Sequence, residues 1–135
     1  MKFIFVLVAI VALSVSVQAL TDQQKEEIKA LQKKCTEATG VDEQLAKKAR
    51  QGTFEDDAKL KKYLLCFLKH LGGVDEQGNF QKDALKTKIE PMIGADKTGK
   101  ILSECLNKKA TPEDSAFEYA KCAYKYRPSE GYPTK

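Results

Sequence analysis

Four cysteines, at positions 35, 66, 105 and 122, set the strongest limit on how this chain can fold. An even number of cysteines in a short chain indicates disulfides in an oxidising compartment, whereas in a reducing one it indicates metal or redox sites. The sequence contains no Cys-x-x-Cys motif, and its lone histidine, His70, cannot build a histidine-rich metal site. Two disulfides are therefore expected if the protein is secreted, and four cysteines allow three pairings.

The N-terminal segment, residues 1–19, predicts secretion. Lys2 precedes an apolar run from Phe3 to Leu13, and Val17 and Ala19 place small residues at a cleavage site. These features are typical of a secretory signal peptide, and we expect cleavage after Ala19. Because a transmembrane helix needs about 20 apolar residues, we expect no stable membrane insertion. The prediction is a secreted, extracellular protein with a single domain over residues 20–135.

Beyond this leader, apolar residues recur mainly at spacings of three and four, and this period predicts helices. Thr21 and Gln24 form a capping box for the first helix. Thr111 followed by Pro112 is an N-terminal signal for the last helix. The expected helices span residues 21–40, 42–52, 55–71, a segment after residue 79 that ends or kinks at Pro91, 97–107 and 111–124.

The third of these helices carries the strongest apolar stripe, which includes Leu60 and Leu64. Cys66 lies about 200° around the helical wheel from Leu64, so this helix needs a bonding partner on the side opposite its stripe. We therefore expect it to be sandwiched between other helices. The predicted fold class is all-α, a compact bundle of about six short helices with two disulfides.

Three segments resemble the insect odorant-binding proteins of the pheromone-binding type. They are residues 62–68 (KYLLCFL), 74–80 (VDEQGNF) and 115–122 (SAFEYAKC). That family usually has six cysteines, with three residues between the second and third and eight between the fifth and sixth. The present chain has four, which resembles the four-cysteine or "minus-C" branch of the family.

The spacing identifies the missing pair. If Cys66 is the third cysteine and Cys122 the sixth, the absent second and fifth fall on Lys62 and Glu113. Those two normally bond to each other, so one whole disulfide is absent. These residues are then expected close together, either as an ion pair or as unrelated surface charges. The resemblance implies that the remaining disulfides are Cys35–Cys66 and Cys105–Cys122.

The resemblance also implies an internal apolar cavity that carries a small hydrophobic ligand, such as an odorant, a pheromone or another lipophilic molecule. It leaves a membrane receptor open as a second partner. The helical stripes alone do not distinguish cavity wall from core, because both are apolar. The residues expected to bind the ligand are Leu64, Phe67, Leu68, Leu71, Leu85, Ile89, Met92, Ile93, Phe117 and Tyr124.

A second class of function stays open at this point. The same helices could surround a filled core, as in a secreted interaction or signalling protein, for example a seminal or haemolymph protein, that acts through its surface. Olfaction is only one option for a carrier, because four-cysteine proteins of this type also resemble haemolymph and reproductive-gland carriers.

Catalysis is not expected. His70 falls in the last turn of the third helix, where a histidine interacts favourably with the helix dipole. A single histidine at a helix end also argues against a histidine-driven pH switch. The 23 Lys and Arg residues are interspersed with 19 Asp and Glu residues, which indicates a solvated surface and no nucleic-acid partner. We expect no catalytic residue, metal or cofactor.

Overall fold

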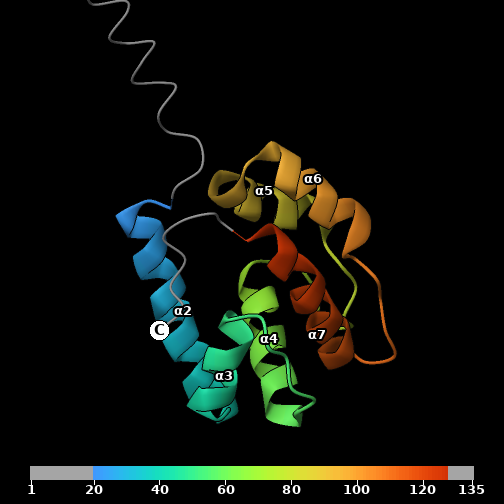
Figure 1. The fold of residues 1–135 in the computed structure, drawn as a ribbon. Coiled ribbons are helices and arrows are strands. Elements are labelled where there is room, and N and C mark those ends of the chain that lie inside the picture. The colour runs from blue at the N-terminus through green and yellow to red at the C-terminus, as the bar shows by residue number, and fades with distance from the viewer. Residues whose placement is uncertain (1–19, 128–135) are drawn as a thin grey trace, which may run out of the picture.

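The computed structural model describes residues 20–127, which form an all-α fold (Figure 1). Among these residues the one extended pairing is an isolated β-bridge between Val74 and Phe80. The predicted fold class is therefore confirmed. In chain order the elements are α2 (Asp22–Thr39), α3 (Glu43–Arg50), α4 (Ala58–His70), α5 (Lys82–Ile93), α6 (Ala95–Glu104), α7 (Pro112–Ala123) and the 3₁₀ helix η1 (Tyr124–Tyr126).

Local capping signals begin and end several of these helices. The Thr21 hydroxyl accepts the backbone N–H of Gln24 at 3.1 Å, and the Gln24 side chain accepts the backbone N–H of Thr21 at 2.9 Å. The predicted capping box is confirmed. Gly40, in the left-handed region at φ 67°, ends α2. Thr111 caps α7 by accepting the backbone N–H of Asp114 at 3.1 Å, as predicted.

Three predicted boundaries were wrong. Helix α4 begins after Asp57 and not at residue 55, because the Asp57 carboxylate accepts the backbone N–H of Leu60 at 2.9 Å. Helix α6 begins two residues earlier than expected, because Gly94, at φ 89°, separates it from α5. It ends at Glu104, and Cys105 is its C-cap. Pro91 lies inside α5, which continues to Ile93.

Helix α4 lies at the centre of the structure, with α2 packed on one side and α7 on the other (Figure 1). The Cys35–Cys66 disulfide joins α2 to α4, so the expected sandwiching of this helix is confirmed. The Cys105–Cys122 disulfide joins the end of α6 to α7. Both pairings that the family resemblance implied are therefore confirmed, and no cysteine is free.

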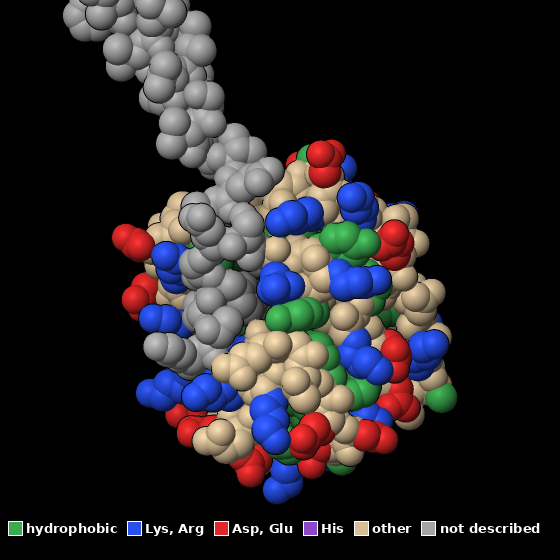
Figure 2. All heavy atoms as spheres, in the orientation of Figure 1, with side chains coloured by type: hydrophobic (Ala, Val, Ile, Leu, Met, Phe, Trp, Pro, Cys, Tyr) green, Lys and Arg blue, Asp and Glu red, His purple; other side chains and the backbone are tan. Residues whose placement is uncertain are grey.

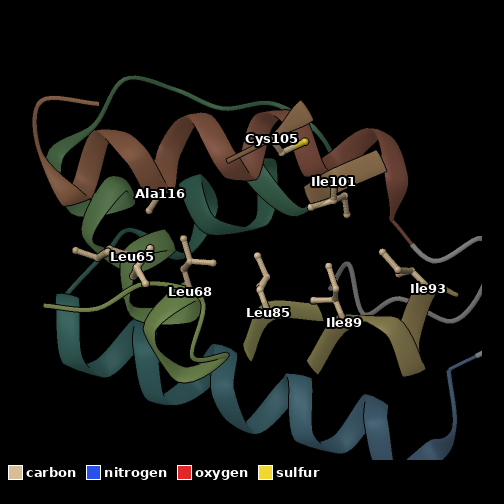
Figure 3. Close-up of a cluster of buried hydrophobic side chains, with 9 residues drawn as sticks. Leu65, Leu68, Leu85, Ile89, Ile93, Ile101, Cys105 and Ala116 are labelled. Atoms are coloured by element: carbon tan, nitrogen blue, oxygen red, sulfur yellow. The ribbon is translucent and has the colours of Figure 1, made fainter. Parts of the chain in front are cut away.

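Two clusters of buried apolar side chains form the core. In the first, α5 directs Leu85, Ile89 and Ile93 toward residues of α4, α6 and α7 (Figure 3). The second lies between α2, α3, α4 and α7 and includes Leu60 and Phe117. Since α4 contributes side chains to both clusters, it connects them.

The surface carries charges of both signs. Basic and acidic side chains are mixed across the face in Figure 2, in agreement with the interspersed charges of the sequence. Among residues 20–127, no helix is long and apolar enough to cross a membrane. The predicted signal peptide, residues 1–19, and the tail from residue 128 lie outside the described residues.

Candidate functional site

A partly open cavity of about 520 Å³ lies between the helices. Helices α2, α4, α5 and α7 supply most of its wall, and most of the lining is apolar. This volume is within the range of small-molecule sites, which are typically about 300 to 1,000 Å³ and mainly hydrophobic. The cavity can therefore hold a small apolar molecule away from water.

Most of the predicted ligand-binding residues line this cavity. Helix α4 and its C-cap supply four of them, α5 supplies three, and η1 supplies one. They are Leu64, Phe67, Leu68, Leu71, Ile89, Met92, Ile93 and Tyr124.

Leu85 and Phe117 do not line it. Leu85 is fully buried in the first core cluster. Phe117 packs edge to face on Phe54, with ring centroids 6.3 Å apart. The ammonium groups of Lys61 and Lys121 each lie 5.2 Å from the Phe117 ring centroid. Both side chains are buried as predicted, but helical spacing does not indicate whether a buried residue faces a neighbouring side chain or a cavity.

The contribution of α2 to the wall was not predicted. Ile28 and Leu31 line the cavity and lie on the same stripe as Cys35. A signal was available, because the implied Cys35–Cys66 disulfide brings this stripe against α4. Two further lining residues, Arg50 at the end of α3 and Phe54 in the following loop, were not predicted either. An arginine in a short amphipathic helix carries no sequence signal that separates it from solvated basic residues.

Arg50 and Tyr63 form a polar pair in the cavity wall. The Arg50 Nη1 donates to the Tyr63 hydroxyl oxygen at 3.3 Å. Tyr63 is only 2% exposed, and this burial raises the pKa of its phenol, while the charge of Arg50 and the hydrogen bond from it act in the opposite direction. Tyr63 is therefore neutral at physiological pH.

Tyr124 lines the cavity and also contacts the residues that follow α3. Its hydroxyl donates to the carbonyl of Gln51 at 3.0 Å. A Cβ on Gly52, at φ 97°, would lie 2.7 Å from the Tyr124 ring, so glycine is required there. The Arg127 guanidinium stacks 4.2 Å above the Tyr124 ring centroid. The predicted site residue thus has its hydroxyl bound within the protein.

His70 lies at the exposed end of α4 and contributes to the cavity lining. Its Nδ1 is 2.9 Å from the carbonyl oxygen of Cys66 and 3.8 Å from the Cys66 Sγ. The Sγ atoms of Cys35 and Cys66 and a His70 nitrogen lie within 4.8 Å of one another. Because both sulfurs are in a disulfide, they offer no thiolate to a metal.

The junction between α4 and α7 contains an ion pair next to the expected positions. Lys61 Nζ lies 3.0 Å from the Asp114 carboxylate and 2.8 Å from that of Asp56. Among the described residues this is the ion pair that joins the two helices, and Lys62 and Glu113 are not in it. Of the two alternatives for Lys62 and Glu113, the structure has unrelated charges and not an ion pair, and the ion pair that joins the helices lies one residue away on each of them.

The family comparison matches most of the chain. Residues 17–126 match the model of the PBP/GOBP family. The B1 protein of Tenebrio molitor is 40% identical over 118 residues, which cover 87% of this chain and 91% of that protein.

Two solved structures have the same fold. One is odorant binding protein 5 of Apis mellifera, with a TM-score of 0.69 and 25% identity, covering 85% of this chain and 99% of that one. The other is the fatty acid binding protein OBP56a of the blowfly Phormia regina, with a TM-score of 0.62 and 27% identity. The match covers 79% of this chain and 94% of that one. With its matched sequence, two disulfides and helical fold, the chain belongs to the PBP/GOBP family of insect odorant-binding proteins, which are binding and carrier proteins and not enzymes.

Proposed function

We propose that this protein is an extracellular carrier that binds a small hydrophobic ligand in the cavity between α2, α4, α5 and α7. The observation that carries the proposal is the apolar cavity of about 520 Å³. Two solved relatives, an odorant binding protein and a fatty acid binding protein, support this class of ligand. Secretion is part of the proposal and rests on the predicted leader.

The driving force would be the transfer of apolar surface out of water. A ligand that buries about 300 Å² gains about 7.5 kcal/mol at roughly 25 cal/mol per Å². Loss of translational and rotational freedom opposes this gain, and because a dissociation constant of 1 μM needs about 8.2 kcal/mol net, we expect affinities no tighter than the micromolar range. A mainly apolar wall discriminates weakly between ligands that differ by one methylene, and we therefore expect broad selectivity among molecules of similar size.

Displacement of the dye N-phenyl-1-naphthylamine tests the proposal. The parent protein should bind the dye saturably and release it when an apolar competitor is added. Met92→Trp and Leu31→Trp should each weaken dye binding by filling the cavity, one from α5 and the other from α2, since both side chains are partly buried and line it. The matched control is Lys29→Trp on the exposed face of α2, which should bind like the parent.

Helical circular dichroism must persist in all three variants for the comparison to hold. Unchanged dye affinity in both cavity variants would place the site elsewhere. Absence of saturable binding by the parent would contradict the carrier proposal and favour a secreted protein that acts through its surface.

A further inference from the structure

The loop between α6 and α7 carries an exposed pair of lysines, Lys108 and Lys109. Residues 107–111 are all exposed, and the loop runs along the right edge of the molecule in Figure 1. Residues 106–110 make no backbone-to-backbone hydrogen bond with any described residue, although the N–H of Lys109 donates to the Ser115 hydroxyl at 2.8 Å. Segments of this kind open locally at low free-energy cost, and exposed loops are preferred sites of proteolytic cleavage.

The distribution of basic residues sets this loop apart from the rest of the described chain. Adjacent lysines also occur at residues 33–34, 47–48 and 61–62, but these three pairs lie inside α2, α3 and α4. The other connections between consecutive helices contain no Lys or Arg. They are residues 40–42, 51–57, 71–81 and 94. Because a protease binds its substrate in an extended conformation, a lysine within a helix can be reached only after the helix has opened.

Lys109 is better placed for cleavage than Lys108. The Lys108 ammonium donates to the Asn79 Oδ1 at 2.6 Å, whereas the Lys109 ammonium has no hydrogen-bond or ion-pair partner among the described residues. Trypsin-like proteases have a carboxylate in the pocket that receives the side chain before the cleaved bond. That carboxylate can pair with the Lys109 ammonium without disrupting a side-chain contact in the substrate. The expected point of cleavage is therefore the bond between Lys109 and Ala110.

The bond lies between two cysteines that are joined to each other. The fragment that ends at Lys109 contains Cys105, and the fragment that begins at Ala110 contains Cys122. The Cys105–Cys122 disulfide would therefore keep the two fragments together after cleavage.

Cleavage would leave the N-terminal end of α7 without its direct chain connection to α6. Helix α7 supplies Ala116 and Ala120 to the cavity wall. Its far end would still be fixed by Cys122, but the end near the cut would be held to α4 by packing and by the Lys61–Asp114 ion pair at 3.0 Å. Because a partly exposed ion pair is weak and depends on salt, this part of the wall should be less firmly positioned.

We propose that the Lys109–Ala110 bond is a processing site for an extracellular trypsin-like serine protease, and that cleavage weakens ligand binding without separating the fragments. One water molecule adds across the amide as its C–N bond breaks. Its oxygen completes a carboxylate on Lys109, and its two hydrogens complete an ammonium group on Ala110. The cleavage site does not depend on the carrier function, whereas the effect on ligand binding rests on it.

Limited digestion with trypsin in the absence of reductant tests the site. The first product from the parent should be heavier by the mass of one water molecule and should separate on reduction into fragments that end at Lys109 and begin at Ala110. Mass spectrometry identifies both. Lys108→Gln with Lys109→Gln should be cleaved about tenfold more slowly or less, because the remaining lysines require a helix to open.

Two further variants serve as controls for this digestion. Lys33→Gln with Lys34→Gln removes an exposed pair of lysines from α2 and should be cleaved at the parent's rate. Lys109→Arg should also be cleaved like the parent, since the acidic pocket of the protease accepts either cation. A first cut within a helix, or equal cleavage rates for the parent and the Lys108→Gln, Lys109→Gln variant, would overturn the site.

Titration of the purified two-chain protein with N-phenyl-1-naphthylamine tests the effect on ligand binding. Its affinity for the dye should be lower than that of the uncut parent, and high salt should increase the loss by weakening the Lys61–Asp114 ion pair. Unchanged dye affinity after cleavage would overturn the effect on ligand binding. Absence of dye binding by the uncut parent would instead contradict the carrier function, and the digestion result would still decide the cleavage site.

Discussion

Helix α4 meets α2 on one side and α7 on the other, and different chemistry holds the two junctions. The junction with α2 contains the Cys35–Cys66 disulfide, and the cavity lies next to it. The junction with α7 contains the Lys61–Asp114 ion pair, next to the positions that the family spacing assigns to the absent disulfide. A covalent bond is independent of pH and salt, whereas a partly exposed ion pair depends on both. The α4–α7 junction should therefore be more sensitive to pH and salt than the α2–α4 junction.

Removal of the α2–α4 disulfide should have the largest effect. Because the bond closes a loop of 31 residues, Cys35→Ser with Cys66→Ser should lower the free energy of unfolding by about 3.7 kcal/mol in the chain-entropy model. Dye affinity should fall as well, since this bond fixes one wall of the cavity. Urea denaturation and dye titration measure the two effects. A stability loss with full dye affinity would show that packing alone positions α2.

Removal of the other disulfide should cost slightly less stability. The Cys105–Cys122 bond closes a loop of 17 residues, so its double serine variant should lose about 3.1 kcal/mol. It joins α6 to α7, away from the α2 wall, and we expect dye affinity to fall less than in the first variant. Equal losses of dye affinity would mean that the cavity depends on global stability and not on the α2–α4 junction.

A new covalent bond should strengthen the α4–α7 junction. Lys62→Cys with Glu113→Cys introduces cysteines at the positions that the family spacing assigns to the absent pair. A disulfide needs Cα atoms within about 7 Å, and its closure should raise the free energy of unfolding by about 2 kcal/mol, the low end of the usual range. Thiol titration and thermal denaturation check this. Persistent free thiols after oxidation would show that the spacing assigns the wrong positions.

The smallest effect concerns the ion pair itself. The hydrogen bond from Lys61 is the main cause that lowers the pKa of Asp114 below its ordinary value of 3.8. Asp114 therefore contributes stability that is present above its unfolded pKa and is lost as the pH falls through the lower folded value. In Asp114→Asn, the free energy of unfolding should therefore decrease less steeply between pH 5 and pH 2 than in the parent. High salt should reduce this difference between the variant and the parent.

Glu113→Gln is the matched control for this measurement, because the neighbouring acid has no ion pair among the described residues. It should keep the parent's pH profile. The hydrogen bonds from Lys61 to Asp56 and Asp114 also raise the pKa of Lys61 above 10.5, so that contribution should persist until the pH exceeds this value. If the free energy of unfolding depended on pH in the same way in the parent and in Asp114→Asn, the ion pair would not contribute to acid sensitivity.

The sequence predicted the features that depend on neighbouring residues. The Thr21 capping box and the Thr111–Pro112 start of α7 follow from local chemistry, and both are present. The start of α4 was misplaced because Glu55, Asp56 and Asp57 are all acidic, and only the structure shows that the third accepts the Leu60 N–H. The disulfide pairing came from family spacing, since loop entropy alone permits other pairings.

The cavity could be predicted only in part, because its wall depends on how helices distant in sequence face one another. Periodicity placed Leu64 and Ile89 on apolar stripes, and both line the cavity, but it treated Leu85 and Phe117 in the same way, although they pack within the core. Arg50 was missed for the opposite reason: a charged residue was assumed to be solvated. Only the packing of α3 against α4 shows that its Nε is buried.

Met92 offers the most direct test of ligand binding in the cavity. The full sequence has two methionines, and the other is Met1 in the predicted leader, so secreted protein labelled with ¹³C-methyl methionine should show a single methyl signal from the cavity wall. Addition of decanoate should shift this signal saturably, with one ligand bound per protein. A signal that does not move, or that moves in proportion to ligand without saturation, would contradict the carrier account.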